Sequence, residues 1–95
     1  MNDGIYSKPR GTYIIAQRGG DYVKIGVTTN LKNRLKDLQL NSPYELYELM
    51  WLPYNDIEGH LKTLFRDLHV RGEWYLRGGR ILEFVSEYKQ STEQN

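Results

Sequence analysis

The hydrophobic and polar residues of this chain follow two periods, one typical of strands and the other of helices. Residues 12–17 are rich in β-branched and aromatic residues, which predicts a strand. In residues 22–27 every second position is valine or isoleucine, which predicts another strand with one buried face. Gly19-Gly20-Asp21 supplies the positive-φ residues of a tight turn, so we expect the two strands to form a β-hairpin.

Three later segments carry apolar residues at helical spacing. The first helix is expected at about 31–40, after the cap-forming residues 28–30, with a buried stripe of leucines. The second is expected to begin at Asn55 or Asp56 and to run to about His69. The third is marked by four apolar residues, Ile81, Leu82, Val85 and Tyr88.

One more strand is predicted between the first two helices. Residues 44–52 carry large apolar residues on both faces of a period-2 pattern, as in a strand that is covered on both sides. Residues 73–76 fit either a short strand or an extended segment. We therefore predict an α+β fold in the order β-β-α-β-α-α, with a small three-stranded antiparallel sheet flanked by helices.

The domain is predicted to span residues 11–89, between an N-terminal arm at 1–10 and a polar C-terminal tail at 90–95. The chain has 95 residues and no cysteine, which excludes disulfides and thiolate metal sites and favours a cytoplasmic location. No signal peptide and no membrane-spanning apolar run is visible. The net charge of +1 is divided unevenly, since residues 1–36 hold seven basic and two acidic residues. This imbalance indicates a polyanionic partner.

Four polar residues are candidates for chemistry. Tyr13 and Lys24 stand on the two strands of the predicted hairpin, Arg34 stands at the edge of the leucine stripe, and Glu58 stands on the second helix near the angle of Phe65. Each of them taken alone is more often an ordinary packed or solvated residue. The motifs of zinc proteases, of phosphate-binding loops and of serine hydrolases are missing from the sequence.

These residues resemble the motifs of the GIY-YIG nuclease superfamily, in particular its compact, phage-associated branch. Four elements carry the likeness in order and spacing: Gly11-Thr12-Tyr13, Lys24-Ile25-Gly26, Arg34, and the helix motif from Glu58 to Phe65. A later segment, Arg71-Gly72-Glu73-Trp74-Tyr75, resembles a signature of that branch. Gly4-Ile5-Tyr6 spells the family name but lacks strand character and the required spacing, so we do not take it as the motif.

The resemblance implies a metal-dependent endonuclease that nicks DNA phosphodiester bonds. It implies that Glu58 binds Mg²⁺ or Mn²⁺, that Arg34 neutralises charge on the scissile phosphate and that Tyr13 activates or positions the attacking water. Lys24 replaces the second tyrosine of the family, and we expect it either to favour the Tyr13 phenolate, by lowering the pKa of Tyr13, or to relay the proton of Tyr13. The expected partner is DNA, with no membrane partner.

Other functions stay open at this stage. Many family members carry a histidine one turn after the arginine, where this chain has Leu38, and some use a C-terminal asparagine that has no counterpart here. The chain is therefore alternatively a DNA-binding module with little or no cleavage activity. A third hypothesis is a phage-encoded adaptor that binds proteins through aromatic residues, namely Tyr44, Tyr47, Trp51 and Tyr54. The sequence leaves open whether the chain is a monomer or a homodimer and whether a protein partner supplies target specificity.

Overall fold

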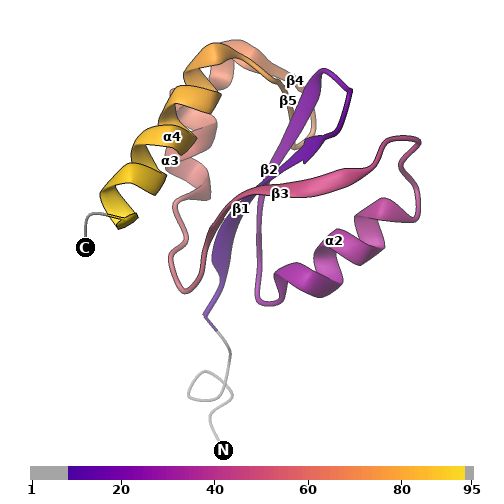
Figure 1. The fold of residues 1–95 in the computed structure, drawn as a ribbon, viewed down its shortest axis with the longest axis horizontal. Helices are drawn as coiled ribbons and strands as arrows, with labels where there is room; N and C mark the ends of the chain where they lie inside the picture. The colour runs from indigo at the N-terminus through magenta and orange to yellow at the C-terminus, as the bar shows by residue number, and fades with distance from the viewer. Residues whose placement is uncertain (1–8, 94–95) are drawn as a thin grey trace, which may run out of the picture.

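Five antiparallel strands form one sheet in residues 9–93, the part of the chain that the computed structural model describes (Figure 1). Their spatial order is β3-β1-β2-β5-β4. The strands are β1 (Gly11–Gln17), β2 (Tyr22–Thr28), β3 (Leu46–Leu52), β4 (His69–Arg71) and β5 (Trp74–Leu76). The helices of the described residues are α2 (Leu31–Gln39), α3 (Glu58–Leu64) and α4 (Gly79–Glu93), with a 3₁₀ turn at Arg66–Leu68.

The fold is α+β, but the prediction of a three-stranded sheet is wrong. Residues 74–76 pair with residues 22–24 and so add β5 to the edge of the hairpin. The predicted helix to His69 ends early, at Leu64, because the backbone leaves the α conformation at Phe65 (φ −109°, ψ 21°). The chain then becomes extended at His69 and forms β4, and Gly72, at φ 55°, makes the turn into β5.

The two faces of the sheet carry separate hydrophobic clusters. The larger cluster lies under α3 and α4, and it includes Ile14, Ile25, Phe65 and Ile81. The smaller cluster, with Tyr13 and Ile15 at its centre, lies under α2. Figure 1 shows α3 and α4 side by side on one face and α2 on the other.

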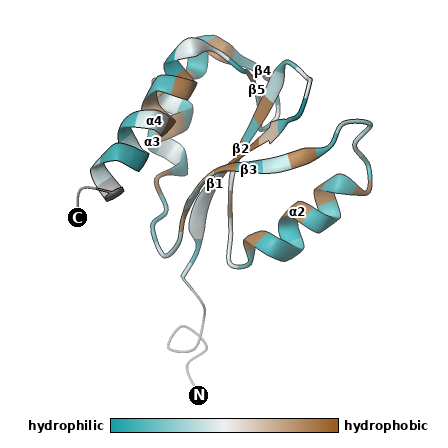
Figure 2. Cartoon of the chain, in the orientation of Figure 1, coloured by the Kyte–Doolittle hydropathy of each residue, from teal (hydrophilic) through white to brown (hydrophobic). Residues whose placement is uncertain are grey.

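The helices bury less of their predicted stripes than expected. No residue of α2 is fully buried, and its leucines are only partly covered. Figure 2 accordingly shows α2 as mostly hydrophilic. In α4 the side chain of Leu82 is 39% exposed, and Phe84 packs against the core where Leu82 was expected to do so.

The described residues cover only part of the predicted N-terminal arm and C-terminal tail. Residues 1–8 and 94–95 lie outside the described residues, so most of the predicted arm, including Gly4-Ile5-Tyr6, is not described. α4 continues to Glu93, into the segment 90–95 that we set apart as a tail. Among residues 9–93, no helix combines the length and the apolar character that crossing a membrane requires.

Candidate functional site

The phenol of Tyr13 lies directly over Gly26 on the face of the sheet that α2 covers. Tyr13 and Gly26 are cross-strand partners in the β1–β2 hairpin, and Ile15 and Lys24 are the partners two positions along. A Cβ atom added to Gly26 would lie 2.5 Å from the Tyr13 hydroxyl oxygen, well inside contact distance. The glycine therefore leaves the space that the phenol occupies.

Glu73 joins this site from the turn before β5. The last pair between β2 and β5 is Lys24 with Trp74, and the backbone N–H of Ile25 then donates to the Glu73 carbonyl at 3.0 Å. This hydrogen bond holds Glu73 beside the part of β2 that follows Lys24, where β5 no longer pairs with it. Its Oε1 atom lies 3.3 Å from the Nζ of Lys24, and its carboxylate is hydrogen-bonded to the hydroxyl of Tyr13.

Helix α3 brings Glu58 and Lys62 to Glu73 from the opposite face of the sheet. The Nζ atom of Lys62 lies 3.1 Å from Oε2 of Glu58 and 3.8 Å from Oε2 of Glu73. One ammonium group thus stands between two carboxylates that come from α3 and from the β4–β5 turn. The side chain of Glu58 is 22% exposed, so water reaches this cluster.

A buried hydroxyl fixes the start of α3. The Thr12 side chain is fully buried, and its Oγ1 donates to the Asn55 carbonyl and accepts from the Ile57 N–H, each at 2.8 Å. Ile57 is the N-cap residue of α3, immediately before Glu58, and its side chain forms no capping hydrogen bond. Thr12 therefore anchors the loop that positions Glu58 to the strand that carries Tyr13.

Arg34 approaches the cluster from α2. Its side chain is exposed, and its positive charge acts on the Tyr13 phenol. Within residues 9–93 no carboxylate forms an ion pair with the Arg34 guanidinium, in contrast to Lys24 and Lys62. Arg34 is thus a cation of the cluster that is available to an anionic ligand.

The pKa of Tyr13 is raised to about 12. Burial is the largest cause, the negative charge of Glu73 is the next, and the charge of Glu58 and the hydrogen bond to Glu73 add to both. Arg34 opposes them. The expected lowering of this pKa by Lys24 is not seen, because the pKa is raised and Lys24, which pairs with Glu73, is not among the charges that shift it. Tyr13 therefore stays protonated at neutral pH.

The neighbouring groups respond to the same charges. Burial alone would lower the pKa of Lys62, but the hydrogen bond to Glu58 and the charges of Glu58 and Glu73 outweigh it and raise that pKa. Burial also raises the pKa of Tyr75, with Lys62 opposing and the two glutamates adding to the rise. Lys62 is consequently held as a cation between the glutamates.

The oxygen atoms around Lys62 also fit a divalent cation. Mg²⁺ is usually held by one or two carboxylates together with water and phosphate oxygens. Glu58 and Glu73 supply two carboxylates that already face one positive group, the Lys62 ammonium. The residues 9–93 contain no cluster of three or more acidic, histidine or cysteine side chains. A metal would therefore depend on these two groups and would require Lys62 to move aside.

Tyr13, Lys24 and Glu58 belong to one connected cluster, and Arg34 acts on it through its charge. Sequence reasoning missed two members, Glu73 and Lys62. Glu73 was visible in the segment from Arg71 to Tyr75 as part of a signature, but that segment gave no indication of its contacts. Lys62 follows Glu58 by four residues, the spacing of a helical ion pair, and this spacing was a usable signal.

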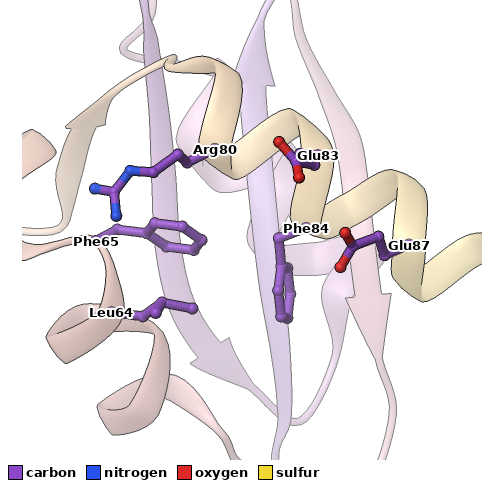
Figure 3. A pocket seen from close by; sticks show the side chains of 6 residues that line it. All are labelled: Leu64, Phe65, Arg80, Glu83, Phe84 and Glu87. Atoms are coloured by element: carbon purple, nitrogen blue, oxygen red, sulfur yellow. The ribbon is translucent and has the colours of Figure 1, made fainter.

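A separate hollow of about 200 Å³ lies between α3 and α4 (Figure 3). Its floor contains Phe65 and Phe84, whose rings meet edge to face at 5.9 Å, and the Arg80 guanidinium lies 5.7 Å from the Phe65 ring. None of the four predicted site residues lines it. We interpret this hollow as a surface groove that forms where α3 and α4 pack together, and not as part of the candidate site.

A comparison with protein families identifies the domain to which most of this chain corresponds. The family model of the T5orf172 domain, a domain found in phage proteins and associated with nuclease-related families, matches residues 10–89. Neither the curated proteins nor the solved structures contain a match to this chain.

Proposed function

Because this chain belongs to the T5orf172 domain family and gathers Tyr13, Lys24 and Glu58 in one cluster beside strands β1 and β2, we propose that it is a metal-dependent endonuclease that nicks DNA. We further propose that it is a compact member of the GIY-YIG superfamily. The observation that carries the proposal is the chain of contacts from Tyr13 through Glu73 and Lys62 to Glu58. It joins both faces of the sheet at a position open to water.

In this proposal the protonated Tyr13 positions the attacking water. Its hydroxyl donates to Glu73, so its oxygen would accept from a water molecule, which would have to enter the cluster because Tyr13 is only 1% exposed. Lys24, held at 3.3 Å from Glu73, keeps that carboxylate in place and adds positive charge near the phosphate. Arg34 binds the non-bridging phosphate oxygens with its planar fork of donors.

Glu58 is the proposed ligand of Mg²⁺ or Mn²⁺, with Glu73 beside it. When bound, such an ion would polarise the phosphate and stabilise the leaving 3′ oxygen. Lys62, which pairs with both carboxylates, would have to leave them for the ion to bind, and its positive charge would then be available to a DNA phosphate. One such site cuts one strand, so the proposed product is a nick.

Conversion of supercoiled plasmid to the open circle tests this function. The protein is incubated with plasmid and Mg²⁺ or Mn²⁺, with and without a chelator. The test variant is Glu58→Gln, and the matched control is Glu83→Gln, which removes an exposed carboxylate from α4. We expect metal-dependent nicking by the natural protein and the control and a loss of about 100-fold or more for Glu58→Gln. Equal nicking by the two variants, or nicking in the presence of chelator, contradicts the proposal.

A second candidate is a DNA-binding module with little cleavage activity. The observation in its favour is the close pairing of Lys62 with Glu58, which neutralises the proposed metal ligand without a metal. Such a module retains DNA on a gel in a salt-sensitive manner but leaves the plasmid supercoiled.

The adaptor hypothesis has less structural support. Of its four aromatic residues, Tyr44 and Tyr54 are exposed, whereas Tyr47 and Trp51 are partly buried. Arg18 stacks on the Tyr47 ring at 4.5 Å and Arg77 donates to its hydroxyl, so Tyr47 is engaged within the chain. The four residues therefore do not form one free aromatic surface.

A further inference from the structure

Trp74 lies between two basic residues in the part of the sheet next to the candidate site. It pairs with Lys24 of β2 on one side and with Arg71 of β4 on the other. Directly opposed residues of antiparallel strands project from the same face. An ammonium, an indole and a guanidinium therefore follow one another across three strands. The Nζ atom of Lys24 lies 5.2 Å from the centre of the Trp74 ring.

A hollow of about 340 Å³ opens beside Trp74. Its lining combines two aromatic rings, a cation and an amide with one valine: Tyr22, Trp74, Arg71, Gln17 and Val70. The Tyr22 side chain is 38% exposed, although it is large and mostly apolar. Gln17 is held in position because its Oε1 atom accepts from the Tyr22 N–H at 3.3 Å.

A second hollow connects this one to the candidate site. It measures about 320 Å³ and extends from Lys24 and Trp74 to the end of α2 and the loop that follows. Gln17 and Trp74 line both hollows, so the indole stands where the two meet. Figure 1 shows α2 beside β3 and away from β4 and β5. A strand of nucleic acid could therefore pass from Lys24 across Trp74 along these two hollows, bordered by Asp37 and Leu38 of α2.

We propose that the hollow bordered by Tyr22 and Trp74 binds an unpaired nucleobase of the DNA strand whose phosphate lies at the candidate site. Single-stranded nucleic acid is bound by aromatic rings that stack on bases beside cations that contact the phosphates, and both are present here within three adjacent strands. The Gln17 amide faces the same hollow and can hydrogen-bond a base edge. This inference rests on the proposed function for its choice of DNA, and it deepens that function by predicting a preference for unpaired or distorted strands. Bases that are stacked within a duplex cannot enter the hollow unless they are flipped out.

Tryptophan fluorescence tests this subsite without any cleavage. The chain has two tryptophans, so Trp51→Phe makes Trp74 the single tryptophan reporter. This protein is titrated, in the presence of a chelator, with oligo(dT) and with an abasic oligonucleotide of the same length and charge. We expect oligo(dT) to quench Trp74 and to bind about tenfold more tightly than the abasic strand. Equal quenching and equal affinity for the two strands would overturn the proposal.

Two further substitutions separate stacking from charge and from folding. Tyr22→Ala, at a partly exposed position, is expected to weaken the binding of oligo(dT) by about tenfold and to leave that of the abasic strand unchanged. Tyr54→Ala removes another exposed tyrosine, outside the hollow, and serves as the matched control. If Tyr22→Ala behaves like Tyr54→Ala, or weakens both strands equally, the proposal is wrong.

The same experiments distinguish this subsite from the proposed function. Base-dependent quenching by a protein that never nicks plasmid supports the subsite and contradicts the nuclease. Metal-dependent nicking by a protein that binds the abasic strand equally well supports the nuclease and contradicts the subsite. An oligouridine of equal length is titrated in the same way. If it quenches Trp74 and binds at least tenfold more tightly than oligo(dT), the hollow binds RNA and the proposal for DNA is wrong.

Discussion

The Nζ atom of Lys24 lies 3.3 Å from Oε1 of Glu73, and this ion pair links β2 to the turn between β4 and β5. The same carboxylate is hydrogen-bonded to Tyr13 and lies 3.8 Å from Lys62. Glu73 thus contacts residues from both faces of the sheet. Its charge is expected to control the protonation of Tyr13 and the positions of the two lysines.

Replacing Glu73 by glutamine should lower the pKa of Tyr13. That pKa is about 12 because burial, the charge of Glu73 and the hydrogen bond to it all raise it. Without the charge it should fall toward the ordinary value of 10 but stay above it, since burial is the largest cause and remains. The measurement is the ultraviolet absorbance of phenolate as a function of pH, with Tyr13→Phe identifying the signal of this residue.

The matched control for this titration is Glu83→Gln, an exposed carboxylate on α4. It should leave the phenolate titration as it is in the natural protein. A titration of Glu73→Gln that cannot be told from that of the control would show that Glu73 does not act on Tyr13.

Tyr13 should also make the fold sensitive to alkaline pH. Its folded pKa of about 12 exceeds the ordinary 10, so the folded protein holds this proton more tightly than the unfolded chain does. The stabilisation is fully present below pH 10 and is lost as the pH rises from 10 to 12. Each pKa unit corresponds to about 1.4 kcal/mol, so the free energy of unfolding should fall by roughly 2–3 kcal/mol through this group.

Tyr13→Phe should not show this part of the alkaline loss. The free energy of unfolding of the natural protein and of Tyr13→Phe is measured with denaturant below pH 10 and near pH 12. The titration of all other groups is the same in both proteins and cancels in the comparison. The idea fails if the two proteins lose the same free energy of unfolding over that range.

The sequence predicted best those elements that are long enough to show a period. The hairpin strands β1 and β2 and helix α2 lie within about two residues of their predicted bounds. β4 and β5 have three residues each, too few for alternation to be recognised. The apolar stripe of α3 also continues through the 3₁₀ turn to Leu68, which still packs against the core, so the pattern alone could not locate the helix end at Leu64.

The same limit applies to the candidate site. Motif spacing singled out Tyr13, Lys24, Arg34 and Glu58, because residue type and order are properties of the sequence. The pairing of Lys24 with Glu73 arises only when β5 adds to β2, and the burial of Tyr13 arises only when α2 packs on the sheet. For that reason the effect of Lys24 on Tyr13 was misjudged, whereas the four residues themselves stay a prediction that the nicking experiments must test.

Gly26→Ala should disturb the site, whereas Gly59→Ala should not. A Cβ atom at Gly26 would lie 2.5 Å from the Tyr13 hydroxyl oxygen, 2.7 Å from its Cζ and 3.0 Å from Oε1 of Glu73. The Tyr13 ring is buried and cannot swing away, so the substitution should cost about 1–3 kcal/mol of unfolding free energy. It should also reduce nicking at temperatures at which the variant is still folded.

At Gly59, in α3, an added Cβ meets no atom within 4 Å. Alanine there should be neutral or should stabilise the protein by up to about 1 kcal/mol, because it favours the helix. Denaturant unfolding of the two alanine variants side by side decides the matter. Equal effects at both positions would mean that the phenol does not depend on the space above Gly26.

Thr12→Val should uncouple Glu58 from the sheet. The Thr12 hydroxyl is buried and bonds both the Asn55 carbonyl and the Ile57 N–H at 2.8 Å, so valine, which has nearly the same shape, leaves a donor and an acceptor without partners. We expect a loss of about 1–3 kcal/mol in the free energy of unfolding. Because Ile57 directly precedes Glu58, the metal concentration needed for half-maximal nicking should rise as well.

Thr29→Val, at an exposed position, is the matched control and should change neither quantity. A Thr12→Val protein with natural stability and natural metal dependence would show that this hydroxyl does not position α3.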